Sequence, residues 1–340
     1  MVMKKRKFIP KNKYVNILCV IAIIVLVALV YVFGVHSVVR QDAVFNVSRG
    51  ASVSAIASQL ESRGLIDMPG VFKLAVRANG GSVQTGQYDI PRGASTWRIA
   101  RMFARGNVAA TTIVIPEGLT VIQIKEMLMQ NPTLTGAVEC GHGTDLPVCN
   151  LHDGDLFPDT YRVARGTSRL AFLDLMRKKM VQVQENWNRA GRIAPKPLKN
   201  WNEIITLASI VQKETPRADE MPIVASVYLN RLNDGMRLQA DPTVVYALTR
   251  GRGDMQGKPL LRGHLKIDSP YNTYTNYGLP PAPIANVGMD AIRAVLQPAD
   301  TNYLYFVADG RGGHRFARTY EEHMKNHADW RMIKNLKNKN

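Results

Sequence analysis

The chain has 340 residues, of which 46% are hydrophobic and 21% are charged. This length and composition allow about two globular domains and exclude an intrinsically disordered protein. The net charge of +17 is compatible with nucleic-acid binding, but the N-terminus argues against it. A basic cluster at residues 4–13 precedes residues 17–35, which carry no charge and are long enough to cross a bilayer once. Because basic flanks stay in the cytoplasm, we expect everything after Arg40 to be exported, and we expect no nucleic-acid partner.

A cleavable signal peptide is the alternative interpretation of this N-terminal segment. The apolar part of a signal peptide is shorter and ends at a cleavage site made of small residues. Residues 31–36 offer no such site. We therefore predict a single uncleaved transmembrane helix at residues 15–36, behind a cytoplasmic tail at residues 1–14.

Two of the three cysteines flank a short loop. Cys140 and Cys149 enclose a segment that contains Gly, His and Pro, and in an oxidising compartment a disulfide between them is favoured. The alternative is zinc bound by both cysteines together with His142 and His152, although their spacing matches no common zinc module closely. Cys19, the third cysteine, lies inside the predicted membrane helix. We expect no metal and no cofactor.

A short pattern occurs three times after the apolar segment, at residues 45–52, 88–95 and 113–120. Each copy starts with alternating apolar residues, as a half-buried strand does, and then turns at a glycine, which adopts a positive φ at little cost. Two residues later Ser52, Ser95 or Thr120 can cap a helix, and Gln123 completes a capping box in the third copy. Each helix then carries an isoleucine that we expect on its inner face: Ile56, Ile99 and Ile124.

The most informative feature is a glutamate at the end of a predicted helix, residues 201–214. Apolar residues recur at helical spacing and define one buried stripe, made of Ile204, Leu207, Ile210 and Val211. Glu214 falls three residues after Val211, so its carboxyl group should emerge on or beside that stripe. A carboxyl group partly removed from water has a raised pKa, which suits it to donate a proton near neutral pH. A paired or solvated glutamate at a helix end is the alternative.

Other helices are predicted on both sides of this one. One begins at Ser168, with inward-facing residues Leu170, Leu173, Leu175, Met176 and Met180. Asn200 can cap the glutamate helix, with Glu203 three residues on. A further helix begins near Pro222, which is tolerated in a first turn. The next is predicted to start at Asp241, with the aspartate as its cap.

Six motifs in this part of the chain resemble those of the YceG-like endolytic murein transglycosylases, the MltG family. In chain order they are Ala208–Thr215, Val227–Leu232, Met236–Val244, Tyr271–Tyr274, Gly278–Ile284 and Tyr305–Gly310. The plan of basic tail, apolar segment, repeats and C-terminal domain is similar to that family from end to end. The chain departs from the family pattern at Asp153, where Glu is usual, at Asp155, and in the insertion between Cys140 and Cys149.

The resemblance implies a substrate and a catalytic residue. The substrate would be the glycan strand of peptidoglycan, cut internally at the β-1,4 bond between N-acetylmuramic acid and N-acetylglucosamine. The product would carry a 1,6-anhydro end, and such cleavage would terminate strand elongation. The family's catalytic glutamate falls on Glu214. Ordinary glycosidases use two carboxylates, but here the sugar's own 6-hydroxyl attacks C1, so one acid suffices.

The repeats resemble the LysM module, which binds glycans containing N-acetylglucosamine. A small spacer that holds the next domain away from the membrane is the alternative. The resemblance also implies a single-pass protein of the bacterial inner (cytoplasmic) membrane with a periplasmic catalytic domain. The family resemblance further implies a link to cell-wall synthases.

Several polar residues within the motifs are candidates for substrate contacts. Gln239, Asn272 and Tyr274 can hydrogen-bond to sugar hydroxyls or N-acetyl groups, and the alternative is that they stabilise loops. Asp241 is the rival for a second carboxylate, although the capping role is favoured.

Two further groups of polar residues have no assigned role. Asn230 and Arg231 sit near a helix C-terminus, where a structural role and a substrate contact are both open. His323 and His327 are four apart on a predicted helix, but no Glu follows His323 to complete a metalloprotease motif. We interpret these histidines, and His314, as surface or structural residues.

Together these patterns predict an α+β protein with one N-terminal transmembrane helix. The predicted regions are a cytoplasmic tail (1–14), the membrane helix (15–36), a LysM-like α+β region (41–130) and a mainly helical α+β catalytic domain (131–335). The predicted activity is that of a lytic transglycosylase. A non-catalytic peptidoglycan-binding scaffold for cell-wall synthases and a muramidase that uses water are the alternatives.

Overall fold

The computed structural model describes residues 11–31, 36–48, 50–141, 144, 146–191, 193–253, 255 and 257–337. It divides into two compact units, Met1–Thr111 with Arg162–Gly166, and Thr112–Tyr161 with Thr167–Asn340. Helices and small two-stranded sheets occur together, so the predicted mixture of α and β structure is confirmed. Strands β3 (Ala110–Val114) and β4 (Thr160–Ala164) form one of these sheets.

The N-terminal helix α1 comprises Lys11–Val30, and its apolar side chains from Ile17 to Val27 are exposed. Within the described ranges, none of the helices combines the length and the apolar character that a bilayer crossing requires. The predicted membrane span is therefore not confirmed. Residues 32–35 of the predicted span lie outside the described part of the chain, and so do the basic residues before position 11.

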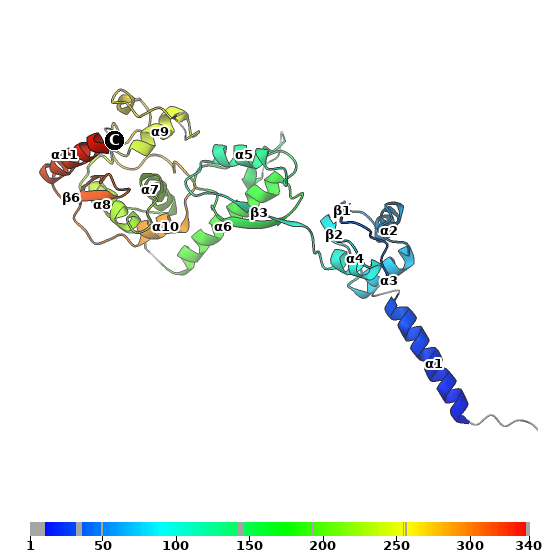
Figure 1. Ribbon diagram of the computed structural model, residues 1–340. Coiled ribbons are helices and arrows are strands. Elements are labelled where there is room, and N and C mark those ends of the chain that lie inside the picture. Colours follow the sequence, from blue (N-terminus) through cyan, green and yellow to red (C-terminus); the bar gives the residue numbers. More distant parts are fainter. Residues whose placement is uncertain are drawn as a thin grey trace, which may run out of the picture. The chain divides into compact units, whose positions relative to one another are not determined.

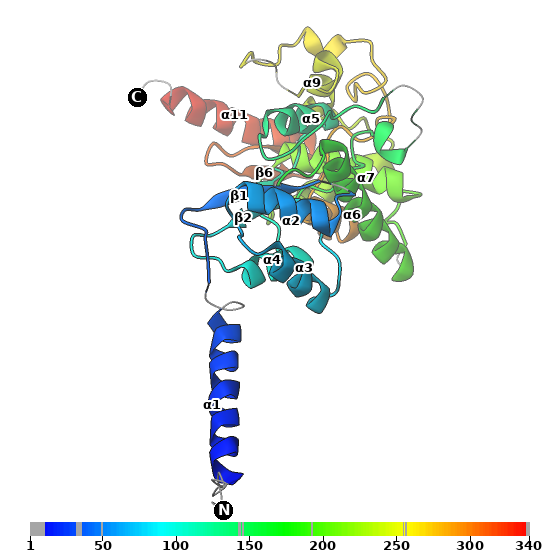
Figure 2. The same cartoon turned by 90° about the vertical axis from the view of Figure 1, so that its right-hand side faces the viewer.

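Besides α1, the described part of the first unit contains a two-stranded antiparallel sheet, whose strands are separated in the sequence by two helices, and a third helix. Its elements are β1 (Ala43–Val47), α2 (Val53–Ser62), α3 (Pro69–Ala78), β2 (Gly86–Ile90) and α4 (Thr96–Ala104). Strands β1 and β2 pair with Phe45 opposite Tyr88, and both side chains are buried. Helix α3 packs against α2 and α4, as both ribbon views show (Figures 1 and 2). Phe45, Phe72, Tyr88 and Phe103 fill the centre of this unit.

The strand–glycine–cap–helix prediction is confirmed in all three copies. The hydroxyl oxygens of Ser52, Ser95 and Thr120 accept hydrogen bonds from backbone N–H groups at the starts of α2, α4 and α5 (Val121–Gln130). Gln123 accepts from the Thr120 N–H and completes the capping box. The turn glycines Gly50, Gly93 and Gly118 all have φ near +80°. The isoleucines at positions 56, 99 and 124 are fully buried. The third copy belongs to the second unit.

The second unit is built around helix α7 (Trp201–Glu214). Its other helices are α5, α6 (Arg169–Arg189), α8 (Met221–Asn233), α9 (Asp241–Thr249), α10 (Met289–Leu296) and α11 (Tyr320–Lys337), with the hairpin β5 (Tyr305–Ala308) and β6 (His314–Ala317). Residues 204–211 of α7 are all buried because α8, α9 and α10 pack around it (Figure 1). The buried surface is thus wider than the predicted single stripe. As predicted, the Asn200 side chain accepts a hydrogen bond from the Glu203 N–H and caps α7.

Helix α6 faces the core differently from the prediction. Leu173, Met176 and Met180 are buried as expected, but Leu175 is 41% exposed and Phe172 is buried instead. The inward face therefore includes position 172 and excludes position 175. Positions 172 and 176 share a helical face, whereas position 175 lies to the side of it.

A disulfide closes the loop between positions 140 and 149. Cys140 and Cys149 are bonded to each other, as the sequence favoured, and Cys149 ends the short 3₁₀-helix η2 (Pro147–Cys149). His142, a ligand in the alternative zinc hypothesis, lies outside the described residues. The imidazole of His152 lies 3.7 Å from Asp155.

Candidate active site

Glu214 is the last residue of α7, and its carboxyl group is half-buried. One carboxyl oxygen, Oε1, accepts a 2.7 Å hydrogen bond from the hydroxyl of Tyr228 on α8. Burial raises the pKa of Glu214 to about 7, and the nearby charge of Asp241 acts in the same direction. The Tyr228 hydrogen bond and the Arg231 charge act against this increase. A substantial fraction of the Glu214 side chains is therefore protonated near neutral pH.

This carboxyl group opens onto a pocket of about 360 Å³. Segments far apart in the sequence line it: Thr120, Lys213, Glu214, Asp241, Pro242, Val245, Tyr246, Gly253, Leu260 and Ile284. An acid at the edge of a mostly apolar pocket, with a few polar groups converging on it, is the arrangement expected of a small-molecule or polymer binding site. Such a site allows proton transfer to a bound oxygen atom.

Tyr228 holds the glutamate in place and was missed as a functional residue from the sequence. It is fully buried on α8, where the sequence pattern indicates only a core residue. Burial raises the pKa of Tyr228 well above its usual value, so its hydroxyl remains a hydrogen-bond donor at all physiological pH values. Since Oε1 is occupied by this bond, Oε2 is the oxygen left for a substrate. A phenol within an otherwise apolar helix face was the available signal.

Asp241 does not cap α9, contrary to the prediction. The cap position is Ala240, and Asp241 is the first helical residue, without a side-chain capping bond. Its exposed carboxylate instead accepts a 2.6 Å hydrogen bond from the Tyr274 hydroxyl. Asp241 lines the same pocket as Glu214, and Tyr274 lies within electrostatic range of the glutamate. The fold therefore brings Glu214, Asp241 and Tyr274 together.

The other two predicted substrate-binding residues differ from each other. Gln239 is exposed two positions before Asp241 and has φ +50°, a conformation that is uncommon outside glycine. Its side chain makes no hydrogen bond to another described residue. Asn272 is fully buried, and its amide group donates to the carbonyls of Leu265 and Ile267. These contacts favour the loop-stabilising alternative for Asn272, whereas Gln239 is free to meet a ligand.

The side chains of Asn230 and Arg231 form hydrogen bonds to backbone carbonyl groups. The Asn230 amide donates to the carbonyls of Thr301 and Tyr303. The guanidinium of Arg231 donates to the carbonyls of Leu304 and Leu238 and is buried. Both residues thus connect α8 to the strand that follows position 303, which favours the structural alternative.

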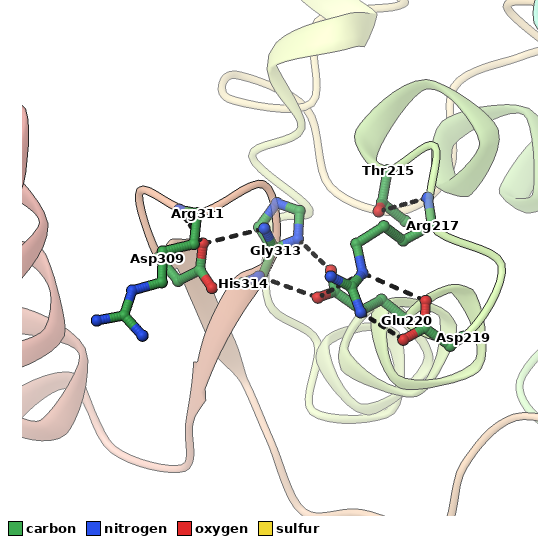
Figure 3. A network of polar contacts seen from close by, with 8 residues as sticks. All are labelled: Thr215, Arg217, Asp219, Glu220, Asp309, Arg311, Gly313 and His314. Atoms are coloured by element: carbon green, nitrogen blue, oxygen red, sulfur yellow. Dashed lines mark hydrogen bonds and ion pairs between the residues drawn. The ribbon is translucent and has the colours of Figure 1, made fainter.

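The segment after Glu214 is held by a polar network that Figure 3 shows. Arg217 pairs with Asp219 and Glu220, and its N–H donates to the Thr215 hydroxyl. Glu220 also pairs with His314, 2.7 Å away on β6. This contact ties the start of α8 to the β5–β6 hairpin and supports a structural role for His314. His323 stacks on Tyr305, and His327 packs against Trp330, so both belong to the packing of α11.

The chain belongs to the YceG-like family, whose model matches residues 45–329. It is 32% identical over 304 residues to the endolytic murein transglycosylase of Bacillus subtilis (strain 168), and the match covers 82% of each chain. The endolytic murein transglycosylase of Streptococcus pneumoniae (strain D39) is 27% identical over 318 residues. That match covers 83% of this chain and 57% of the pneumococcal protein. A crystal structure of a yceG-like protein from Listeria monocytogenes is 29% identical, with a TM-score of 0.49 over 84% of this chain and 98% of that one.

Proposed function

We propose that this protein is an endolytic murein transglycosylase in which Glu214 is the only acid–base residue. The observation that carries this proposal is a half-buried carboxyl group with a pKa of about 7, fixed by Tyr228 at the edge of a pocket. The relatives named above carry the same activity in their names. The substrate is then the glycan strand of peptidoglycan.

In the first step, protonated Glu214 gives its proton to the bridging oxygen between N-acetylmuramic acid and N-acetylglucosamine. The C1–O bond of the muramic acid sugar breaks, and the N-acetylglucosamine end leaves as an alcohol. Glu214 is left as a carboxylate. Its raised pKa makes this transfer favourable near neutral pH, since the protonated form is populated and is acidic enough to release its proton.

In the second step, the 6-hydroxyl of the same muramic acid sugar attacks C1. The Glu214 carboxylate removes the hydroxyl proton and returns to its starting form. The new C1–O6 bond makes the 1,6-anhydro end. Because the attacking group is already part of the reacting sugar, the reaction gains the advantage of an intramolecular step and needs no water and no enzyme nucleophile. No second carboxylate is required.

The carboxylate of Asp241 in the same pocket favours a second candidate function, a muramidase in which Asp241 activates water. The two functions differ in their products. Digestion of purified sacculi followed by mass spectrometry of the fragments should yield anhydro-muramic acid ends. Reducing ends would favour the muramidase, and binding to sacculi without any fragment would favour the non-catalytic scaffold. The Asp241→Asn variant should still produce anhydro ends.

Tyr228→Phe removes the hydrogen-bond donor from Glu214 without changing the shape of the residue. We expect kcat to decrease roughly 10-fold because the carboxyl group is less well oriented. The Tyr228 bond lowers the pKa of Glu214, so its loss should raise that pKa. Since the acid form is active, the decline of activity above neutral pH should shift to higher pH. Activity measured from pH 5 to 9 checks this.

The matched control is Tyr320→Phe, at an exposed tyrosine at the start of α11. It should leave both kcat and the pH profile unchanged. An unaltered pH profile in Tyr228→Phe would contradict the positioning role.

We further propose that residues 17–35 anchor the protein in the cytoplasmic membrane, with the basic tail inside and the enzyme outside. The charge-free run and the basic cluster before it support this placement. The region at 41–130 would then hold glycan near the membrane, where strands are synthesised and where cell-wall synthases are available as partners. Release of the full-length protein from membranes by alkaline carbonate would contradict the anchor.

A further inference from the structure

A second and larger pocket, of about 640 Å³, adjoins the pocket of Glu214. Tyr246 of α9 lines both, so the two pockets meet at this side chain. The second pocket lies between α5, which contributes Ile122 and Met129, and the segment around the disulfide, which contributes Leu151. The reaction described above uses none of these residues.

The lining of this pocket suits a sugar. Tyr246 and Tyr271 both line the pocket, and their ring centroids lie 4.8 Å apart. Aromatic faces pack against the apolar C–H faces of sugar rings. On the rim, Lys125 forms an ion pair with Glu139, 2.9 Å apart, in reach of hydroxyl and amide groups. Aliphatic side chains complete the wall.

The disulfide closes one wall of this pocket. Val138 and Glu139 stand directly before Cys140, and Leu151 and His152 follow Cys149 by two and three positions. The disulfide therefore links the two chain segments that contribute these lining residues. It limits how far that wall can move away from α5.

Asp153 connects the wall to the helices on either side. Its carboxylate accepts a 2.6 Å hydrogen bond from the Val121 N–H at the start of α5 and a 2.7 Å bond from the Tyr246 hydroxyl. The ring that separates the two pockets is thus held in a fixed orientation. A glycan strand that passes over the Tyr246 ring from one pocket to the other would therefore lie on a rigid surface.

We propose that this pocket binds a saccharide segment of the same glycan strand, beyond the sugars that react at Glu214. This inference rests on the proposed function. An enzyme that cuts within a polymer must hold chain on both sides of the cut, and a pocket of about 360 Å³ does not accommodate a long segment. Tyr246 gives the strand a continuous path from one pocket to the next. Affinity should then increase with strand length.

The test measures glycan binding by variants in which a larger side chain fills the second pocket. Ile122→Trp and Met129→Trp place an indole in the pocket from exposed positions on α5, 39% and 52% accessible, where a larger side chain does not disturb the core. Each is combined with Glu214→Gln so that strands are bound but not cut. Calorimetry with peptide-free glycan octasaccharides should give a Kd about tenfold weaker in each variant. Binding of a disaccharide should not change.

The matched control is Leu175→Trp, at an apolar residue of α6 that is 41% exposed and lies away from both pockets. It should bind both ligands like the Glu214→Gln parent. If the octasaccharide binds the filled pockets as tightly as the parent, the inference is wrong while the proposed function stands. If the parent binds no glycan of either length, the proposed function itself is wrong.

Two further arms complete the test. The double variant Cys140→Ser with Cys149→Ser should also weaken octasaccharide binding, because the wall is no longer closed. Octasaccharide affinity equal to that of the disulfide-bonded parent would contradict this role of the bond. Strands that keep their peptides serve as a second ligand. If the filled pockets weaken only the peptide-bearing strands, the site binds the stem peptide, and its assignment to sugar is overturned.

Discussion

Glu214→Gln is expected to abolish the release of anhydro-muropeptides from sacculi, with a decrease of roughly 10²–10⁴-fold, the usual contribution of a general acid or base. Glutamine keeps the shape of the side chain, and its carbonyl oxygen can still accept the Tyr228 hydrogen bond. It has no proton to give to the bridging oxygen and cannot remove one from the 6-hydroxyl. Chromatography of the soluble fragments measures the loss.

The stability of the same variant separates a chemical role from a structural one. Burial raises the pKa of Glu214 from 4.5 to about 7, so the folded protein holds this proton more tightly than the unfolded chain. Its stability therefore decreases as pH rises between these values, and the charged form stays unfavourable above them. Glutamine removes this cost. At pH 8 the variant should unfold at the same temperature as the wild type or a higher one.

Glu203→Gln is the matched control, in the first turn of the same helix. Its carboxylate accepts a hydrogen bond from the Lys199 N–H and lies outside the pocket. This variant should keep full activity. Full activity in Glu214→Gln, or an equal loss in both variants, would contradict the assignment of Glu214.

Asn286→Ala is expected to be the most destabilising of the single substitutions considered. Asn286 is fully buried, and its amide oxygen accepts hydrogen bonds from the N–H groups of Gly154 and Leu156, 3.1 and 3.0 Å away. Its amide nitrogen donates to the carbonyl of Leu119. Alanine leaves the N–H groups of Gly154 and Leu156 unpaired inside the protein, whereas the Leu119 carbonyl keeps the hydrogen bond from the backbone N–H of position 286. The free energy of unfolding should decrease by roughly 3–5 kcal/mol, as urea denaturation can measure.

Activity should decrease with it, because these bonds hold the segments that lead to Thr120 and Asp153. Asn302→Ala is the control, since Asn302 is exposed and its side chain bonds to no other described residue. Its effect should stay within about 0.5 kcal/mol. A similarly small effect at Asn286 would mean that the three segments are held by other contacts.

Much of the local structure follows from short patterns in the chain. The caps at Ser52, Ser95 and Thr120 were predictable because a hydroxyl, a glycine with positive φ and an apolar helix face lie within ten residues of each other. The capped helix α7 and its terminal glutamate were predictable because Asn200 stands before a run of apolar residues at helical spacing. The order of motifs was sufficient to indicate the family that the comparison confirmed.

Other features could not be read from local patterns. Leu175 has the spacing of a core residue, but the described structure leaves it 41% exposed. Asp241 has the sequence position of a helix cap, yet its carboxylate accepts a hydrogen bond from the hydroxyl of Tyr274 instead. In both cases contacts with residues distant in the sequence decide the outcome. Leu175 lacks enough of them to be buried, and Asp241 gains one that replaces the capping bond. Asn286 shows this even more clearly. Its partners Gly154, Leu156 and Leu119 are distant in the sequence and lie in irregular segments, so no local pattern indicates its role.

The amino-acid sequence alone was enough to establish the α7 helix, an acid at its end and the series of motifs around it, because these depend on neighbours along the chain. Only the folded structure decides that this acid is half-buried beside Tyr228, and that Asp241 and Tyr246 complete its pocket. The pKa of a carboxyl group depends on how much water surrounds it and which charges face it. Those are set by helices α8 and α9, which reach Glu214 only when the chain is folded.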